Sequence, residues 1–172
     1  EQARHLYTTL DDAAGLSRAV RSLGIVADYE GEVAEARTLY QQSLEISRAG
    51  GDRRGAGAAL SNLGLLAADE GDSDQARRLY AAALDTAREF DDKKVLGNTL
   101  LNLALLEDEL GNGSQARALL DESLAQFRAL GDPWNVALVL FNLGNILSDA
   151  GEPDPAEPCF RESLRIYRDL GD

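Results

Sequence analysis

The chain repeats itself every 40 residues, and the period holds without an insertion. Four sets of positions show the repeat in every copy: Gly31, Gly71, Gly111 and Gly151; Ala36, Ala76, Ala116 and Ala156; Leu44, Leu84, Leu124 and Leu164; Arg48, Arg88, Arg128 and Arg168. Self-similarity at this period is typical of architectures in which each unit packs only against its neighbours. The fold must therefore be one that is built by stacking copies of a single unit.

Each unit is predicted to be a pair of antiparallel helices. Asp132 and Pro133 form a helix start, with an N-cap followed by a proline at the first helical position, and Asp12, Asp52 and Asp92 are expected to cap in the same way. The glycine of each unit suits a left-handed residue at the end of the first helix. Residues of the second helix recur at steps of three and four, as a helical stripe requires: Ala76, Leu79, Tyr80, Ala83, Leu84 and Ala87. The fold class is therefore all-α, with helices of about 18 residues.

Small residues mark where the two helices of a pair cross closely. Gly64 on the first helix, with Ala76 and Ala83 on the second, occupies positions where a large side chain would hold the backbones apart. We expect one array over residues 1–172, with the end of a preceding repeat at 1–12 and repeats at 13–52, 53–92, 93–132 and 133–172. Because the chain begins at Glu1 and contains no methionine, we also expect it to be a segment of a longer protein.

The repeat resembles the tetratricopeptide repeat family. The resemblance rests on Leu63, Gly64, Gly71, Ala76, Tyr80 and Ala83, and it recurs in phase four times. The commonest repeat in that family has 34 residues, and both helices here are longer. Forty-residue versions are similar to those of Pins-type cell-polarity adaptors and of bacterial signalling ATPases and maltose-activator-type transcription regulators. The resemblance implies a right-handed α-solenoid with a concave, peptide-binding face.

Composition excludes several classes of function. The net charge of −13 would repel a phosphate backbone, and no apolar run is long enough to cross a membrane, so we expect neither nucleic acid nor a membrane as partner. The one histidine, His5, shares a phase with solvent-facing positions, and the one cysteine, Cys159, shares a phase with core leucines. No catalytic constellation, phosphate loop or metal-ligand spacing is present. We expect a cytoplasmic protein that is not an enzyme and has no cofactor or metal.

The family resemblance assigns the concave face to the first helix of each pair. The candidate groove residues on that helix are Arg18, Arg21, Arg54, Asn62, Leu65, Asn98, Asn102, Trp134, Leu138, Phe141, Asn142 and Asn145. Three of them, Asn62, Asn102 and Asn142, form a row with one amide per repeat. Because an amide both donates and accepts, such a row can hold the backbone of an extended peptide. Alternatively, each asparagine bonds to a neighbouring helix and fixes the geometry of the repeats.

The two ends of this stripe differ in chemistry. Arg18, Arg21 and Arg54 make the N-terminal end basic, whereas Trp134 and Phe141 make the C-terminal end apolar. Arginine and tryptophan are frequent anchors of interfaces. The alternative for the apolar end is that a further repeat covers it. The same end carries Pro158, which predicts that the last helix starts late or is kinked.

Three functions follow from this sequence. The first is a module that binds a protein or peptide partner, or another domain of the same parent protein, in the groove. The second is a regulatory sensor arm of a larger signalling ATPase or transcription regulator. The third is a self-assembly scaffold, because both ends of an array expose unpaired helix faces.

Overall fold

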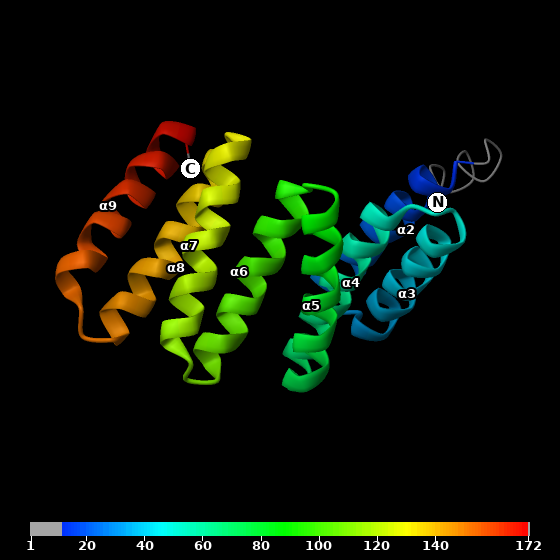
Figure 1. Ribbon diagram of the computed structural model, residues 1–172, viewed down its shortest axis with the longest axis horizontal. Coiled ribbons are helices and arrows are strands. Elements are labelled where there is room, and N and C mark those ends of the chain that lie inside the picture. The colour runs from blue at the N-terminus through cyan, green and yellow to red at the C-terminus, as the bar shows by residue number, and fades with distance from the viewer. Residues whose placement is uncertain (1–11, 172) are drawn as a thin grey trace. The chain divides into compact units, whose positions relative to one another are not determined.

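The computed structural model describes residues 12–171, and over that part of the chain it contains eight α-helices and no strand. The predicted end of a preceding repeat, His5 within it and Asp172 lie outside the described residues, except for Asp12. The helices are α2 (Ala13–Tyr29), α3 (Val33–Ala49), α4 (Arg53–Asp69), α5 (Ser73–Glu89), α6 (Lys93–Glu109), α7 (Gly113–Leu130), α8 (Pro133–Asp149) and α9 (Pro153–Leu170). Short turns join them, and within each helix pair the two helices run antiparallel (Figure 1). The predicted all-α solenoid of helix pairs is confirmed.

Helix starts follow the aspartate pattern. The side chains of Asp12, Asp52 and Asp132 accept hydrogen bonds from the third residue beyond each, at 2.8, 3.0 and 3.2 Å. Each bond satisfies one of the backbone N–H groups that a helix start leaves unpaired. Pro133 occupies the first turn of α8, where its missing N–H costs nothing. These caps fix where the first helix of three of the pairs begins.

Helix ends follow the glycine pattern. Gly31, Gly71, Gly111 and Gly151 have φ angles of 79°, 81°, 79° and 78°, so the predicted left-handed residues are confirmed. The turns that follow the second helices have positive φ angles as well, at Gly51, Gly131 and Gly171. In the second repeat the equivalent residue is Asp91, with a φ of 49°. Among the described residues Asp91 is the only non-glycine with a positive φ. The left-handed conformation costs a residue with a Cβ more than it costs glycine.

A small residue on the first helix faces a large one on the second. A methyl group on Gly24, Gly64 or Gly144 would lie 2.6, 2.7 or 2.6 Å from ring atoms of Tyr40, Tyr80 or Phe160. In the third pair the two positions hold Ala104 and Leu120, both fully buried. Where the second helix carries the smaller Leu120 in place of an aromatic ring, the first helix carries the larger Ala104 in place of glycine. The predicted close crossing is confirmed at the three glycines.

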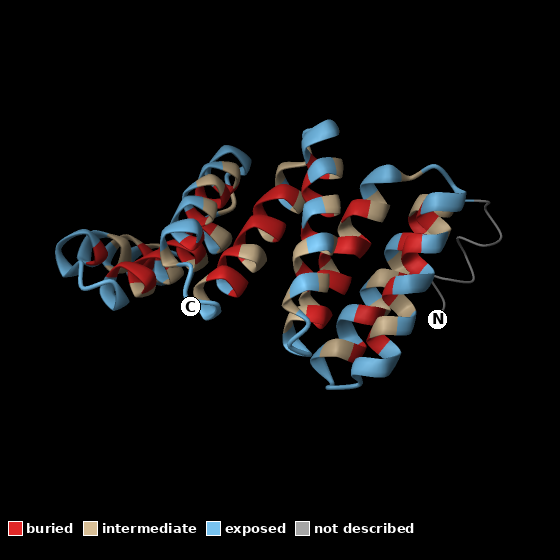
Figure 2. Cartoon of the chain, turned by 60° about the horizontal axis from the view of Figure 1, so that its bottom comes forward, coloured by how far each residue is buried: buried red, intermediate tan, exposed pale blue. Residues whose placement is uncertain are grey.

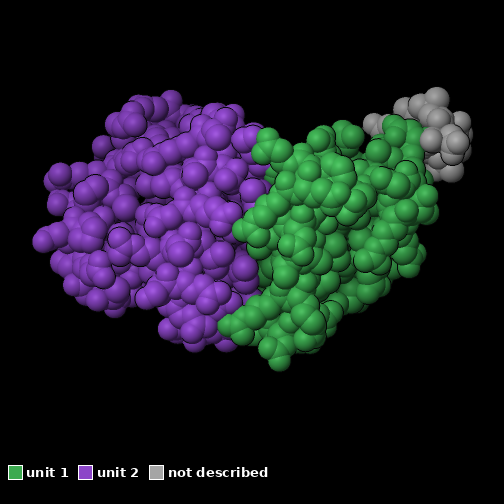
Figure 3. All heavy atoms as spheres, viewed as in Figure 1, with its two compact units in different colours: residues 1–92 green, residues 93–172 purple. Residues whose placement is uncertain are grey.

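The chain forms two compact units, Glu1–Asp92 and Lys93–Asp172 (Figure 3). In the first unit, Tyr40 and Leu44 of α3 share a buried cluster with Leu60, Leu63 and Leu66 of α4. A second cluster lies in the other unit and joins α7 to α8 through Leu120, Leu124, Val139, Leu140 and Leu143. Buried residues recur along every helix, and in the last three pairs the first helix buries more residues than the second (Figure 2). In both units, therefore, the second helix of one pair packs against the first helix of the next.

Of the two alternatives predicted for the last helix, the late start is wrong, and the kink at Pro158 stays a prediction. Helix α9 begins at Pro153 and continues through Pro158 to Leu170. Pro153 lies in the first turn, where backbone N–H groups have no partner in the helix. Pro158 leaves the carbonyl of Asp154 without its usual partner, but both residues are exposed, so water can bond that carbonyl.

Candidate functional site

In the first unit, the candidate groove residues lie on α2 and α4, which contact each other and both pack against α3. Arg18 and Arg54 are exposed, whereas Arg21, Asn62 and Leu65 are partly buried. Desolvation lowers the pKa of the Arg21 guanidinium, and the charge of Arg18 acts in the same direction. A guanidinium that has lost part of its hydration gives up less on pairing with a carboxylate. The two arginines of α2 therefore make a basic spot in an acidic chain.

Arg54 is tied to the end of α5. Its Nη2 donates to the backbone carbonyl of Phe90 at 3.2 Å, and its guanidinium lies 5.7 Å from the centre of the Phe90 ring. Arg53 is 5.4 Å from the same ring centre and pairs with Glu89 at 2.5 Å. These contacts hold the start of α4 against the end of α5. Arg54 thus has a structural contact within its own helix pair and still exposes its charge.

The asparagines do not share one environment. The Asn142 Nδ2 donates to the carbonyl of Leu138 at 2.9 Å, within its own helix. The Asn62 Nδ2 is buried and, over the part of the chain that the structure describes, has no hydrogen-bond partner. Asn102 is partly buried, as the other two are. A buried amide donor without a partner costs free energy, and because this nitrogen has no surface in contact with solvent, a ligand does not reach it in this conformation.

In the second unit, the candidates lie on α6 and α8, both of which pack against α7. Asn98, Asn102, Leu138, Asn142 and Asn145 are partly buried. The two aromatic residues of α8 are half-exposed, Trp134 at 49% and Phe141 at 47%. The structure therefore gives α8 the largest exposed apolar side chains of the predicted stripe.

Comparison with the other repeats separates these two aromatics. The equivalents of Trp134 are Ala14, Arg54 and Lys94; Arg54 and Lys94 are exposed, and Ala14 is partly buried. The equivalents of Phe141 are Arg21, Ser61 and Leu101; Ser61 and Leu101 are only 5% exposed, and Arg21 is partly buried. Phe141 also packs edge-on against Phe160, with ring centroids 6.0 Å apart. Trp134 thus occupies a position that is exposed in three of the four repeats, whereas Phe141 occupies one that is exposed in the last repeat alone.

Serines that the sequence reasoning missed hold helix pairs together. The Ser123 Oγ donates to the carbonyl of Gly97, and the Ser163 Oγ to the carbonyl of Ala137, each at 2.8 Å. Ser43 makes the same kind of bond to Ser17 at 3.0 Å. The signal was readable, because serine occupies this phase in three repeats and Ala83 in the fourth. These bonds fix the orientation of the first helices.

The described residues that could bind a metal ion or act as a nucleophile include the acidic side chains and Cys159. They contain no group of three or more histidine, cysteine or acidic side chains that could hold a metal ion. Cys159 packs partly against the core, and burial raises the pKa of its thiol, as do the charges of Asp121 and Glu162. A thiol held protonated in this way is a poor nucleophile. Over the same residues, no helix has the length and apolar character needed to cross a membrane.

The model of the tetratricopeptide repeat family matches residues 12–89 and 95–169. The chain belongs to the tetratricopeptide repeat family. Its members generally mediate protein–protein interactions and are typically not catalytic. Comparison with curated proteins finds no match.

Among solved structures, the tetratricopeptide chain is similar to BtubC (BKLC) from P. vanneervenii, with a TM-score of 0.78 and 23% sequence identity. The match covers 93% of this chain and 66% of the other, so this chain spans slightly less than two thirds of that protein. At this level of identity the likeness shows the fold alone.

Proposed function

We propose that this tetratricopeptide segment binds an extended peptide or partner segment along the first helices of its pairs. The observation that supports it most is Trp134. It is a large apolar side chain, 49% exposed, at a position where other repeats also face solvent. The exposure of this position recurs along the chain, since its equivalents Arg54 and Lys94 are exposed as well. Tryptophan at such a position is a strong candidate for an interface anchor.

The amides supply the second part of the proposal. Asn142 keeps an Oδ1 acceptor beside its internal bond, whereas the buried Nδ2 of Asn62 would reach a peptide only after its side chain turns outward. An extended peptide has backbone donors and acceptors that its own conformation does not satisfy. Asn62, Asn102 and Asn142 would bond to that backbone without selecting its side chains. The charge of Arg18 and Arg21 would favour an acidic residue near the end of the peptide that meets α2.

The test is selection of peptides from a random displayed library against the wild-type chain. The enriched peptides are then measured against a variant with Asn62, Asn102 and Asn142 changed to alanine. We expect a loss of affinity of at least roughly tenfold, because each lost bond to a buried or partly buried partner costs about 0.5–1.5 kcal/mol. A matched control changes three exposed amides on second helices, Gln41, Gln42 and Gln115, to alanine, and it should keep the wild-type affinity.

Melting temperature distinguishes binding from a packing role for the asparagines. If the asparagine variant melts lower than the control variant but binds peptides as well as the wild type, the amides fix the repeats and do not contact a ligand. If it binds less well at an unchanged melting temperature, the proposal stands.

A further inference from the structure

The turn between α6 and α7 differs from the equivalent turns of the other three pairs at two positions. One holds Glu107, which is buried with 1% of its surface exposed, and its equivalents are the apolar residues Ala27, Ala67 and Leu147. The other holds Asn112, the N-cap of α7, and its equivalents are the acidic residues Glu32, Asp72 and Glu152. The Nδ2 of Asn112 donates to Oε2 of Glu107 at 2.7 Å. Of these four turns, only this one therefore buries a carboxylate and supplies it with a donor from the helix start.

The side chain of Asn112 bonds to Glu107 instead of capping its own helix. The equivalent Asp72 accepts a hydrogen bond from the backbone N–H of Gln75 at 2.9 Å, whereas Asn112 makes no capping bond of this kind. An ionised carboxylate at position 112 can cap α7 as Asp72 caps α5, but it cannot donate to Glu107. It would also bring a like charge close to a buried carboxylate, where water screens little. The amide at position 112 is therefore matched to Glu107.

Asn112 is also the only asparagine in the chain that is followed by a glycine. In such a pair the backbone nitrogen of the glycine can attack Cγ of the asparagine, because no Cβ on the glycine hinders the approach. A bond forms between the Gly113 nitrogen and Cγ, the bond from Cγ to Nδ2 breaks, and Nδ2 leaves as ammonia with the proton of the Gly113 N–H. Water then opens the cyclic imide and leaves aspartate or isoaspartate at position 112. The only co-reactant is water, and nothing is oxidised or reduced.

The start of α7 leaves room for this reaction. Gly111, Asn112 and Ser114 are exposed, and a Cβ on Gly113 would have no packing neighbour within 4 Å. Gly113 is the first residue of α7, where backbone N–H groups have no partner within the helix. At the Asn112 ψ of 48° the Gly113 nitrogen points away from the Asn112 side chain, so the Cα–C bond has to rotate before the attack. Few packed atoms resist that rotation, and exposed helix ends open at little cost in free energy.

We propose that Asn112 is a site of spontaneous deamidation, and that its conversion to an acid loosens the connection between α6 and α7. The reaction removes the donor that Glu107 bonds at 2.7 Å and puts a carboxylate in its place. Asp108 and Glu109 precede this turn, and the nearest basic residue in the sequence of the unit, Arg117, pairs with Glu152 at 3.3 Å. The new charge therefore joins a turn that is already acidic. Asn112 is not a candidate groove residue, so this modification is independent of peptide binding.

Mass spectrometry of the folded chain, kept in mildly alkaline buffer and sampled over time, measures the reaction. Trypsin cleaves after Lys94 and Arg117, so peptide 95–117 carries Asn112 together with Asn98 and Asn102 as internal controls. We expect Asn112 to convert at least roughly tenfold faster than either control, because larger residues follow those two. Gly113→Ala should slow the conversion of Asn112 at least roughly tenfold, although its methyl group has room in the folded chain. If Asn112 stays intact in the folded chain and converts only in urea, the proposal is overturned.

Thermal melting of Asn112→Asp, which reproduces the aspartate product, measures the consequence. We expect its melting temperature to lie roughly 2–5 °C below that of the wild type, because a hydrogen bond to a buried carboxylate is lost. Ser114→Asp is the matched control, since it adds the same charge to the same helix start and should not lower the melting temperature. In a chain with Glu107→Gln, whose amide can donate to an acid at position 112, Asn112→Asp should cost less than in the wild type. An equal cost in both chains, or no loss in the wild type, would contradict the proposed role of Glu107.

Discussion

Trp134 and Phe141 lie on the same helix, seven residues apart, and expose almost the same fraction of their surface, 49% and 47%. Their equivalents in other repeats differ. In the second and third repeats the positions equivalent to Trp134 are exposed, whereas those equivalent to Phe141 are buried. Equal exposure therefore has two origins in this molecule. The surface around Trp134, here called the built surface, is also exposed in the second and third repeats, whereas the surface around Phe141, Phe160 and Leu164, here called the end surface, is exposed only in the last of the described pairs.

In a repeat protein, a residue can be compared with the equivalent residues of the other repeats in the same chain. Stability in such proteins is approximately a sum of terms within each repeat and terms between neighbours. Trp134 on the built surface is half in water and should contribute little to either term, so its substitution should leave stability nearly unchanged. A residue of the end surface occupies a position that contributes strongly wherever a neighbour is present. The predictions below compare equivalent residues on these grounds.

The largest expected difference is between Leu124→Ala and Leu164→Ala. Leu124 lies in a buried cluster with residues of α8, and removing its side chain should cost about 3 kcal/mol of unfolding free energy. Leu164 is half-exposed at the equivalent position, and its loss should cost less than about 1 kcal/mol. Urea unfolding followed by circular dichroism measures both. Equal losses would show that Leu164 is covered in solution, contrary to the end-surface assignment.

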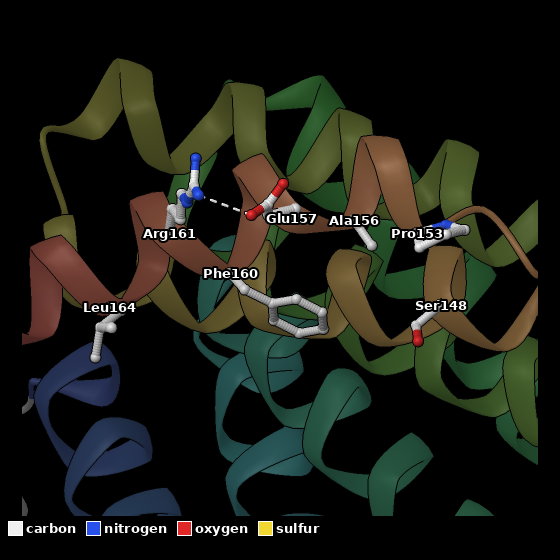
Figure 4. A pocket seen from close by; sticks show the side chains of 7 residues that line it. All are labelled: Ser148, Pro153, Ala156, Glu157, Phe160, Arg161 and Leu164. Carbon is white, nitrogen blue, oxygen red and sulfur yellow. Dashed lines mark ion pairs between the residues drawn. The ribbon is translucent and has the colours of Figure 1, made fainter.

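Glycine substitutions at the helix crossings should show a smaller difference of the same kind. A methyl group on Gly64 would lie 2.7 Å from the fully buried ring of Tyr80, and Gly64→Ala should cost about 2–3 kcal/mol. A methyl group on Gly144 meets the ring of Phe160 at 2.6 Å, but that ring borders an open pocket, lined by Ser148 of α8 and residues of α9 (Figure 4), and can move. Gly144→Ala should therefore cost about 1 kcal/mol in the same unfolding assay.

A double-mutant cycle provides the control for the crossing. Combining Gly144→Ala with Phe160→Leu recreates the Ala104 and Leu120 pair of the third repeat. The combined loss should be smaller than the sum of the two single losses. Additive losses would contradict the exchange of volume between the two helices.

The buried phenol of Tyr40 should make the free energy of unfolding depend on pH. Desolvation raises the pKa of its phenol to about 12, with the charge of Asp28 acting in the same direction, whereas the phenol of an unfolded chain titrates near 10. The contribution of this phenol to the free energy of unfolding is therefore fully present below pH 10 and is lost as the pH rises toward 12. The difference in unfolding free energy between wild type and Tyr40→Phe should change by about 2 kcal/mol over that interval, in the direction that disfavours the wild type. A difference that stays constant from pH 9 to pH 12 would mean that the phenol is hydrated in the folded state.

The smallest expected effect on stability is that of Trp134→Ala. Half of this side chain is already in water, and its position is open in other repeats, so the substitution should change the unfolding free energy by less than about 1 kcal/mol. Thermal melting of the variant beside the wild type measures it. A drop of several degrees with no effect on binding would instead make Trp134 a packing residue.

Much of the fold could be predicted from the sequence, because repetition turns weak local signals into strong ones. The caps at Asp12, Asp52 and Asp132 and the left-handed glycines depend only on local backbone chemistry, which the pattern shows directly. The continuity of α9 through Pro158 could not be predicted in this way. It depends on whether the carbonyl of Asp154 reaches water, and that is a property of the folded surface.

The candidate faces were predictable only in outline. The helical phase identified Trp134 and Phe141 as residues on one stripe, but the phase does not tell how closely a neighbouring helix covers each of them. The contact of Arg54 with Phe90 could not be predicted for the same reason, since it joins residues 36 positions apart in the sequence. Similarly, the three serine bonds between paired helices needed the three-dimensional register of the crossing, although the recurrence of serine was visible.

The most direct test of this account is the affinity of library-selected peptides for two single variants, Trp134→Ala and Phe141→Ala, measured beside the wild type by isothermal titration. The account predicts that Trp134→Ala weakens binding at least roughly tenfold, whereas Phe141→Ala changes it less than about twofold. The opposite order, with Phe141→Ala weakening binding and Trp134→Ala leaving it unchanged, would contradict the distinction between the built surface and the end surface.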